Sequence, residues 1–196
     1  MTGVGAVILA AGGSSRMGRP KQLLPYHGRS LLRHAAAVAL AGGCEPVVVV
    51  LGAAADQMRT ELEGLAGTGA GNPGWAQGPG TSGRGGLASV GEPEAVVFLL
   101  CDQPLVDEDH VRRLIGAWRE TGRPMVASGY DGTVGVPALF ARETFPRLRT
   151  LDPVSGAKQL LLGTPEAVAV VPFPAGAIDL DTPGDYERFR TDPAGS

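Results

Sequence analysis

The stretch VGAVILAAGGSSRMGRPKQLLP, residues 4–25, decides the fold that we expect for this chain. Its apolar run over 4–9 is typical of a strand buried inside a parallel sheet. Small residues and glycines follow the run at once, and two cations, Arg16 and Lys21, come shortly after them. Because open α/β sheets bind ligands just beyond the carboxyl ends of their strands, this stretch predicts a ligand-binding turn.

The residues that follow alternate between helix and strand patterns. Ser30 is a suitable N-cap for a helix over 31–41, and the apolar run 46–51 predicts the next strand. A polar-faced helix is expected over 53–63, and the glycine-rich stretch 64–86 is expected to be a functional loop. This alternation predicts a parallel sheet with helices on both faces.

The second half of the chain carries the same kinds of signal. The run 95–101 predicts a buried strand, and Asp107 is expected to cap a helix over 108–119. Further strands are expected over 124–128, 135–140, 167–171 and 177–180, and a further helix over 156–162. The tetrapeptide Thr182-Pro183-Gly184-Asp185 predicts a capping box at the start of a last helix. We expect a single domain over 1–190 and a disordered tail over 191–196.

Composition narrows the class of protein. The 196 residues suit one α/β domain, and the formal net charge of −3 provides no basic field that would attract nucleic acid. Cys44 and Cys101 form no CxxC motif, which argues against a disulfide framework and against a structural zinc site. No apolar run reaches the roughly 18 residues that a membrane span needs. We therefore expect a cytoplasmic protein without a nucleic-acid or membrane partner.

The turn after the first strand has the composition of a phosphate-binding loop. Its small residues are Ala10, Ala11, Gly12 and Gly13. They let a ligand approach the backbone N–H groups, which can bind a phosphate or form hydrogen bonds with a base edge. Arg16 offers a planar fork and Lys21 a mobile point charge, both suited to polyphosphate oxygens. The alternative is a glycine-rich turn whose two cations are merely solvated.

Three aspartates stand where a divalent metal could be held. Asp102 directly follows the strand 95–101, and Mg²⁺ prefers one or two carboxylates together with substrate phosphates. The alternative for Asp102 is a turn-forming role. Asp179 and Asp181 alternate along the expected strand 177–180 and should therefore point to opposite faces. We expect Asp181 to be the second metal ligand, unless it only helps to cap the next helix.

Five motifs, in this order along the chain, resemble the molybdenum-cofactor nucleotidyltransferases of the nucleoside-triphosphate transferase fold family. They are LAAGGSSRMGRPKQLLP (9–25), NPGWAQGPGTSGRGGL (72–87), CDQP (101–104), GVPALF (135–140) and DLDTPGDYERF (179–189). The double alanine of LAAG and the CDQP motif are more similar to the cytidylyltransferase branch than to the guanylyltransferase branch. The resemblance implies a three-layer α/β sandwich with a mostly parallel, Rossmann-like sheet, of the nucleotide-diphospho-sugar transferase type.

The resemblance also implies roles for single residues. The nucleotide would be bound by Ala10, Ala11, Gly12, Gly13, Gly80 and Ser82. Catalysis would depend on Arg16, Lys21 and Asp102, with Mg²⁺ as cofactor held by Asp102 and Asp181. Asn72 and Trp75 would face the acceptor.

The expected reaction moves a nucleoside monophosphate, with CMP favoured, from a nucleoside triphosphate to the phosphate of a small acceptor. Molybdopterin is the acceptor that the resemblance implies, and a molybdoenzyme or its chaperone would be a partner. Three alternatives stay open: a sugar phosphate or another phosphorylated metabolite as acceptor, a nucleotide-binding regulator or chaperone without turnover, and a redox enzyme with a dinucleotide. The last is disfavoured because neither GxGxxG match, at 69–74 and 78–83, follows an expected strand through a tight turn.

Overall fold

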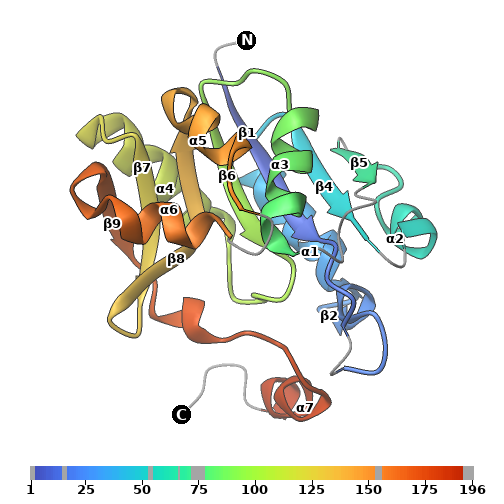
Figure 1. The fold of residues 1–196 in the computed structure, drawn as a ribbon. Helices are drawn as coiled ribbons and strands as arrows, with labels where there is room; N and C mark the ends of the chain where they lie inside the picture. The colour runs from blue at the N-terminus through green and yellow to red at the C-terminus, as the bar shows by residue number, and fades with distance from the viewer. Residues whose placement is uncertain are drawn as a thin grey trace.

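A twisted sheet of seven strands runs through the centre of the molecule (Figure 1). The computed structural model describes residues 3–14, 17–52, 55–65, 67–71, 78–152 and 156–191. The strands lie in the order β5-β4-β1-β6-β8-β7-β9. Their bounds are Val4–Ala10 (β1), Val47–Leu51 (β4), Gly67–Gly71 (β5), Ala95–Leu100 (β6), Met125–Tyr130 (β7), Thr133–Ala141 (β8) and Val168–Pro172 (β9). Because β8 alone runs antiparallel to its neighbours, the mostly parallel sheet that we expected is confirmed.

Helices cover both faces of the sheet and complete a three-layer sandwich (Figure 1). One face packs against α1 (Leu31–Ala41), α2 (Ala55–Glu61) and α4 (Glu108–Thr121). The other face packs against α3 (Pro79–Ser89), α5 (Phe145–Arg149) and α6 (Ala157–Gly163). Successive residues of β1 alternate between these two cores: Ala6 and Ile8 belong to the first, and Val7 to the second.

A third, smaller core lies beyond the carboxyl ends of the strands. It joins α7 (Pro183–Thr191) to the hairpin of β2 (Pro25–Tyr26) and β3 (Arg29–Ser30). Tyr186 and Phe189 of α7 pack there with Leu24, and the Tyr186 hydroxyl donates a hydrogen bond to the Pro25 carbonyl at 2.7 Å. This packing ties the end of the chain to the segment that follows β1, on the side of the sheet where ligands bind in such folds.

The predicted helix starts are confirmed at atomic level. The Ser30 hydroxyl accepts the N–H of Arg33, and the Asp107 carboxylate accepts the N–H of His110. At the start of α7, Asp185 accepts the Thr182 N–H at 2.8 Å, while its own N–H donates to the Thr182 hydroxyl. These caps depend only on residues three apart, so the local sequence determines them.

Two sequence-based expectations are wrong. Residues 177–180 form no strand: a 3₁₀ turn covers Pro174–Ala177, and the backbone then passes the end of β6, with Leu180 donating its N–H to the Asp102 carbonyl. The stretch 64–86 is not one loop, because β5 and most of α3 lie within it. Glycine permits this close packing, since a Cβ at Gly86 would lie 2.3 Å from Cγ1 of Val7.

The ends of the expected domain can be compared only in part. Helix α7 ends at Thr191, one residue beyond the expected boundary, and the rest of the predicted tail, 192–196, lies outside the described residues. Within the described part of the chain, every helix is too short or too polar to cross a membrane.

Candidate active site

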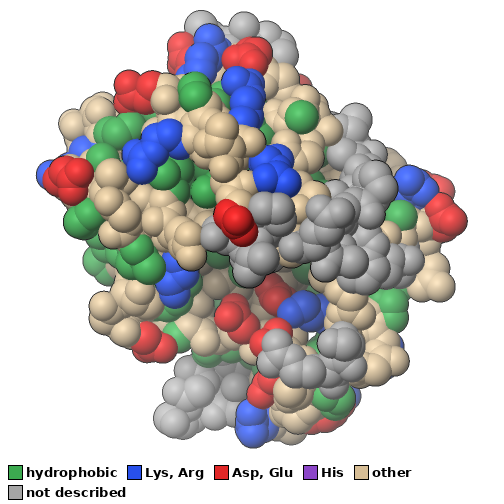
Figure 2. Space-filling model, viewed as in Figure 1, with side chains coloured by type: hydrophobic (Ala, Val, Ile, Leu, Met, Phe, Trp, Pro, Cys, Tyr) green, Lys and Arg blue, Asp and Glu red, His purple; other side chains and the backbone are tan. Residues whose placement is uncertain are grey.

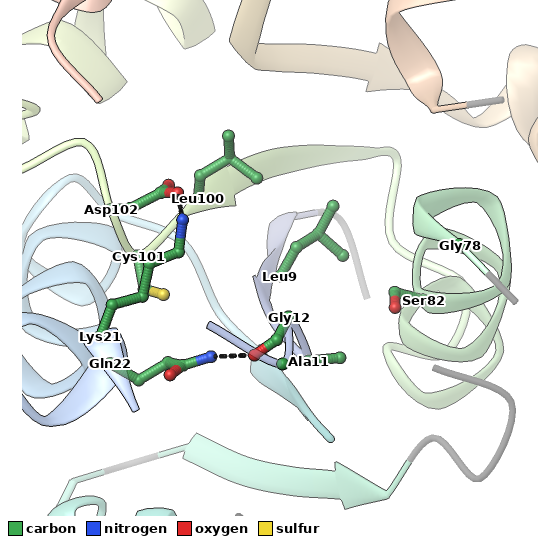
Figure 3. A pocket seen from close by; sticks show the side chains of 11 residues that line it. Leu9, Ala11, Gly12, Lys21, Gln22, Gly78, Ser82, Leu100, Cys101 and Asp102 are labelled. Atoms are coloured by element: carbon green, nitrogen blue, oxygen red, sulfur yellow. Dashed lines mark hydrogen bonds and ion pairs between the residues drawn. The ribbon is translucent and has the colours of Figure 1, made fainter. Parts of the chain in front are cut away.

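A cavity of about 340 Å³ opens at the carboxyl ends of β1 and β6 (Figure 3). After β1 the chain builds β4 and β5 on one side and then returns to add β6 on the other side. Neighbouring parallel strands whose connections leave in opposite directions create a crevice at their carboxyl ends, which is where open α/β sheets bind ligands. Figure 2 shows a hollow at this level of the molecule, in which acidic side chains lie beside a basic one.

Lys21 lies between two carboxylates that come from distant parts of the chain. Its Nζ forms a short ion pair with Oδ2 of Asp102 and a second one, at 2.9 Å, with Oδ1 of Asp181. The side chains of Lys21 and Asp102 are 15% and 13% exposed, and that of Asp181 is 38% exposed. Burial by itself lowers the pKa of Lys21, but the two carboxylates outweigh it and hold this pKa above its usual value. Lys21 is therefore a fixed cation.

The second carboxylate oxygen of Asp102 is suited to a metal ion. Oδ1 of Asp102 is buried and has no hydrogen-bond partner among the described residues. A buried carboxylate oxygen without a partner is costly, and a divalent cation would satisfy it. In the described part of the chain, no group of three or more His, Cys, Asp or Glu side chains is placed to hold a metal. An ion bound by Asp102 and Asp181 would thus take its other ligands from substrate and water, as Mg²⁺ commonly does.

Asp179 belongs to the same acidic cluster, contrary to our expectation. Burial, together with the negative charges of Asp102 and Asp181, raises the pKa of Asp179 to about 6. The prediction that Asp179 and Asp181 point to opposite faces loses its basis, because the alternation of side chains applies only within a strand and residues 177–180 form none.

The loop after β1 is shaped by Gln22, a residue that the sequence analysis did not single out. Gln22 is only 1% exposed, and its Nε2 donates to the carbonyls of Ala10 and Gly12 at 2.8 and 2.9 Å. Its Oε1 accepts the hydroxyl of Ser14, a residue with a φ of 50°. The only signal in the sequence is a polar residue in the segment KQLL, between Lys21 and two leucines.

Most of the predicted site residues meet in this cavity. Those that line it are Ala11, Gly12, Gly13, Lys21, Ser82 and Asp102, and Asp181 joins them through Lys21. Ala10 and Gly80 are buried beside the cavity and are not among its lining residues. Gly80 and Ser82 lie on a helix, α3, where we expected a loop. Arg16, Asn72 and Trp75 lie outside the described residues.

The cavity also has walls that the motifs did not predict. Leu9, Gly78, Leu100 and Cys101 line it together with Gln22. Burial strongly raises the pKa of the Cys101 thiol, so this cysteine is a wall residue without nucleophilic character. Figure 3 shows Ser82 of α3 across the cavity from Lys21 and Asp102.

Comparison with known proteins assigns the fold and site to a family. Residues 6–168 match the family described as the MobA-like NTP transferase domain. The chain belongs to this family. The sequence-based resemblance to the molybdenum-cofactor nucleotidyltransferases is thereby confirmed, and so is the expectation of an enzyme of the nucleotidyltransferase class.

Several curated relatives of this MobA-like chain carry different names. It is 41% identical over 142 residues to nicotine blue oxidoreductase of Paenarthrobacter nicotinovorans. The aligned region covers 71% of this chain and 67% of that protein. It is 31% identical to the purine catabolism protein PucB of Bacillus subtilis, over 94% of both chains. It is 32% identical to the molybdenum cofactor guanylyltransferase of Rhodobacter capsulatus, again over 94% of both.

A solved structure from Mycobacterium tuberculosis H37Rv shares the fold of this MobA-like chain. The Rv0371c protein superposes with a TM-score of 0.84 at 30% identity, covering 97% of this chain and 99% of that one. The same mycobacterial protein has also been solved in complex with manganese, with a TM-score of 0.74 at 29% identity and coverage of 97% and 100%.

Proposed function

We propose that this protein is a divalent-metal-dependent nucleotidyltransferase that moves a nucleoside monophosphate from a nucleoside triphosphate to the phosphate of a small acceptor. The observation that carries the proposal is the Lys21 ammonium held between Asp102 and Asp181, beside a small-residue loop at the switch point of the sheet. CTP is the nucleotide that the LAAG and CDQP motifs favour, and molybdopterin is the proposed acceptor. A molybdoenzyme or chaperone partner and a cytoplasmic location stay predictions from the sequence.

The proposed chemistry is a single displacement at phosphorus. An oxygen of the acceptor phosphate attacks the α-phosphorus of the nucleotide, and the bond from that phosphorus to the oxygen bridging to the β-phosphate breaks. Pyrophosphate leaves with the electron pair of that bond. A phosphate monoester is already an anionic nucleophile, so positioning and charge neutralisation are enough and no general base is required.

The charge of the cluster supports a need for metal. Among the described residues of the cluster, three carboxylates, those of Asp102, Asp179 and Asp181, surround one cation, Lys21, so these side chains alone would repel a triphosphate. Asp102 and Asp181 would hold the divalent ion, which supplies neutralisation of the phosphate oxygens when bound. A related protein has been solved with manganese, which supports a divalent ion here, and we propose Mg²⁺ as the ion used. Lys21 would stabilise the charge that develops as the bond to pyrophosphate breaks.

One observation favours a second candidate. The relative with 41% identity is named an oxidoreductase, and it covers 71% of this chain. A redox role would require a redox cofactor, such as a flavin or a nicotinamide dinucleotide. An absorbance spectrum of the purified protein, recorded before and after titration with flavin and nicotinamide dinucleotides, tests this second candidate.

The experiment that tests the main proposal measures pyrophosphate release. The protein is incubated with Mg²⁺ or Mn²⁺, each of the four nucleoside triphosphates, and either molybdopterin or a panel of sugar phosphates. We expect metal-dependent release with CTP and molybdopterin. Release only with a sugar phosphate would replace the acceptor, and nucleotide binding without release under any condition would contradict the enzymatic role.

A further inference from the structure

We propose that Gln22 is the positioning residue that fixes the nucleotide-binding shape of the loop 10–14. This inference rests on the function proposed above, since it assumes that the loop binds a nucleotide. Gln22 is only 1% exposed although it lines the cavity. A buried amide is costly unless its polar atoms are bonded, and both ends of this one are bonded to the loop.

The two donated hydrogen bonds orient the peptide groups of the loop. Nε2 of Gln22 holds the carbonyls of Ala10 and Gly12 at 2.8 and 2.9 Å. In a planar trans peptide the carbonyl and the next N–H point in opposite directions. The N–H groups of Ala11 and Gly13 therefore point away from Gln22, and both residues line the cavity. Gln22 thus sets the direction of the backbone donors that a phosphate or a base edge would contact.

The accepted hydrogen bond connects the loop to Lys21. Oε1 of Gln22 accepts the Ser14 hydroxyl at 3.2 Å, and the same hydroxyl oxygen accepts the N–H of Lys21 at 3.0 Å. Ser14 has a φ of 50°, a backbone conformation that residues other than glycine adopt only when their surroundings hold them there. One buried side chain therefore couples the loop to the backbone of the fixed cation.

The chain contains a matched control for this role. Thr144 is also buried, at 5% exposure, and its Oγ1 also donates to a backbone carbonyl, that of Ala141 at 2.7 Å. Ala141 pairs with Ala95, and Ala95 pairs with Val4 at the amino end of β1, so this hydrogen bond lies at the opposite edge of the sheet from the loop 10–14. Gln22→Met and Thr144→Val each remove a buried side-chain donor to the backbone.

The test compares Gln22→Met with Thr144→Val in two measurements. Binding of CTP and of GTP, each with Mg²⁺, is measured by titration calorimetry, and Tm is measured for each variant. We expect both variants to lose stability, and Gln22→Met alone to bind nucleotide roughly 10- to 100-fold more weakly because its loop is less often in the binding shape. In turnover, the KM for the nucleotide should rise for Gln22→Met while kcat stays within about threefold, because uniform binding is lost.

The outcomes separate this inference from the proposed function. Wild-type protein that binds neither CTP nor GTP rejects the proposed function itself. If the wild type binds nucleotide and Gln22→Met binds it with the same affinity, the role of Gln22 is rejected. It is also rejected if both variants lose the same amount of affinity. If Gln22→Met does not fold, Ser14→Ala removes only the link between the loop and Lys21; we then expect roughly 3- to 10-fold weaker binding, and unchanged binding overturns the inference.

Discussion

Replacing Lys21 by methionine should make the nucleotide-free protein bind Mn²⁺ more tightly. The ammonium of Lys21 occupies the space between Asp102 and Asp181, the two carboxylates that we assign to the metal. A divalent ion must therefore displace this cation or bind beside it. Methionine keeps the length and apolar stem of the side chain and removes the charge, so the carboxylates stay in place and lose their competitor.

The size of the effect follows from the geometry of the ion pairs. Two unit charges about 4 Å apart interact by about 4 kcal/mol at an effective dielectric constant near 20. Lys21 is closer than this to both carboxylates, but Asp181 is 38% exposed, and water screens part of the interaction. Each factor of ten in affinity corresponds to about 1.4 kcal/mol, so we expect a gain of roughly 10- to 100-fold in Mn²⁺ affinity.

The assay is a titration of nucleotide-free protein with Mn²⁺, followed by the paramagnetic resonance signal of the free ion. The matched control is Lys158→Met, which removes the other lysine of the chain from an exposed position on α6. The control should bind Mn²⁺ like the wild type. Equal or weaker Mn²⁺ binding by Lys21→Met would show that the ammonium does not compete for the carboxylates, and the assignment of the metal to them would be wrong. The same variant should lose about 10²- to 10³-fold in turnover, because the nucleotide then lacks its fixed cation.

Three further predictions concern the metal ligand, the packing of α3 and a buried histidine. Asp102→Asn should abolish Mn²⁺ binding and lower pyrophosphate release by about 10²-fold or more, and an unchanged metal requirement would remove Asp102 from the site. Gly86→Ala should lower the free energy of unfolding by about 1–3 kcal/mol in a denaturant titration, because the new methyl group would lie 2.3 Å from Val7. Gly85→Ala is the control: its methyl group would meet no neighbour, so the free energy of unfolding should not fall in this way. Burial lowers the pKa of His110 to about 4, so the unfolded chain binds the proton more readily and stability falls as the pH drops below about 6.5. Between pH 7 and pH 5 we expect a loss of about 2 kcal/mol in the free energy of unfolding that is absent from His110→Gln, and equal slopes for both proteins would contradict it.

Features that depend on near neighbours were predicted from the sequence. The caps at Ser30 and Asp107 need only a side-chain oxygen and an N–H three residues later, so the local pattern determines them. The central strands are apolar on both faces because helices cover both, and such runs are visible in a single sequence. The resemblance implied a shared role for Lys21 and Asp102, and the fold explains why they meet: both follow the ends of parallel strands, which share one edge of the sheet.

Features that depend on distant packing were not predicted. A helix with as many glycines as α3 has low intrinsic propensity, and it is stabilised by lying close against β1 and β4, where Gly86 leaves room for Val7 and Val50. Gln22 donates to carbonyls 10 and 12 residues away, so no periodicity in the sequence distinguishes it from a solvated glutamine. In both cases the conformation depends on residues that are distant in the sequence: the strands against which α3 packs, and the carbonyls to which Gln22 donates.

The position of Asp181 depends on packing at the far end of the chain. Lys21 and Asp102 are 81 residues apart, but the strands that precede them, β1 and β6, are adjacent in the sheet. Lys21 and Asp181 are 160 residues apart, and Asp181 lies on no strand of the described sheet. Two contacts position Asp181. The Leu180 N–H donates a hydrogen bond to the Asp102 carbonyl, and the Tyr186 hydroxyl of α7 donates one to the carbonyl of Pro25, shortly after Lys21. The sheet thus positions Asp102, and the third core positions Asp181. Metal affinity should therefore depend on the packing of α7 as well as on the two carboxylates themselves.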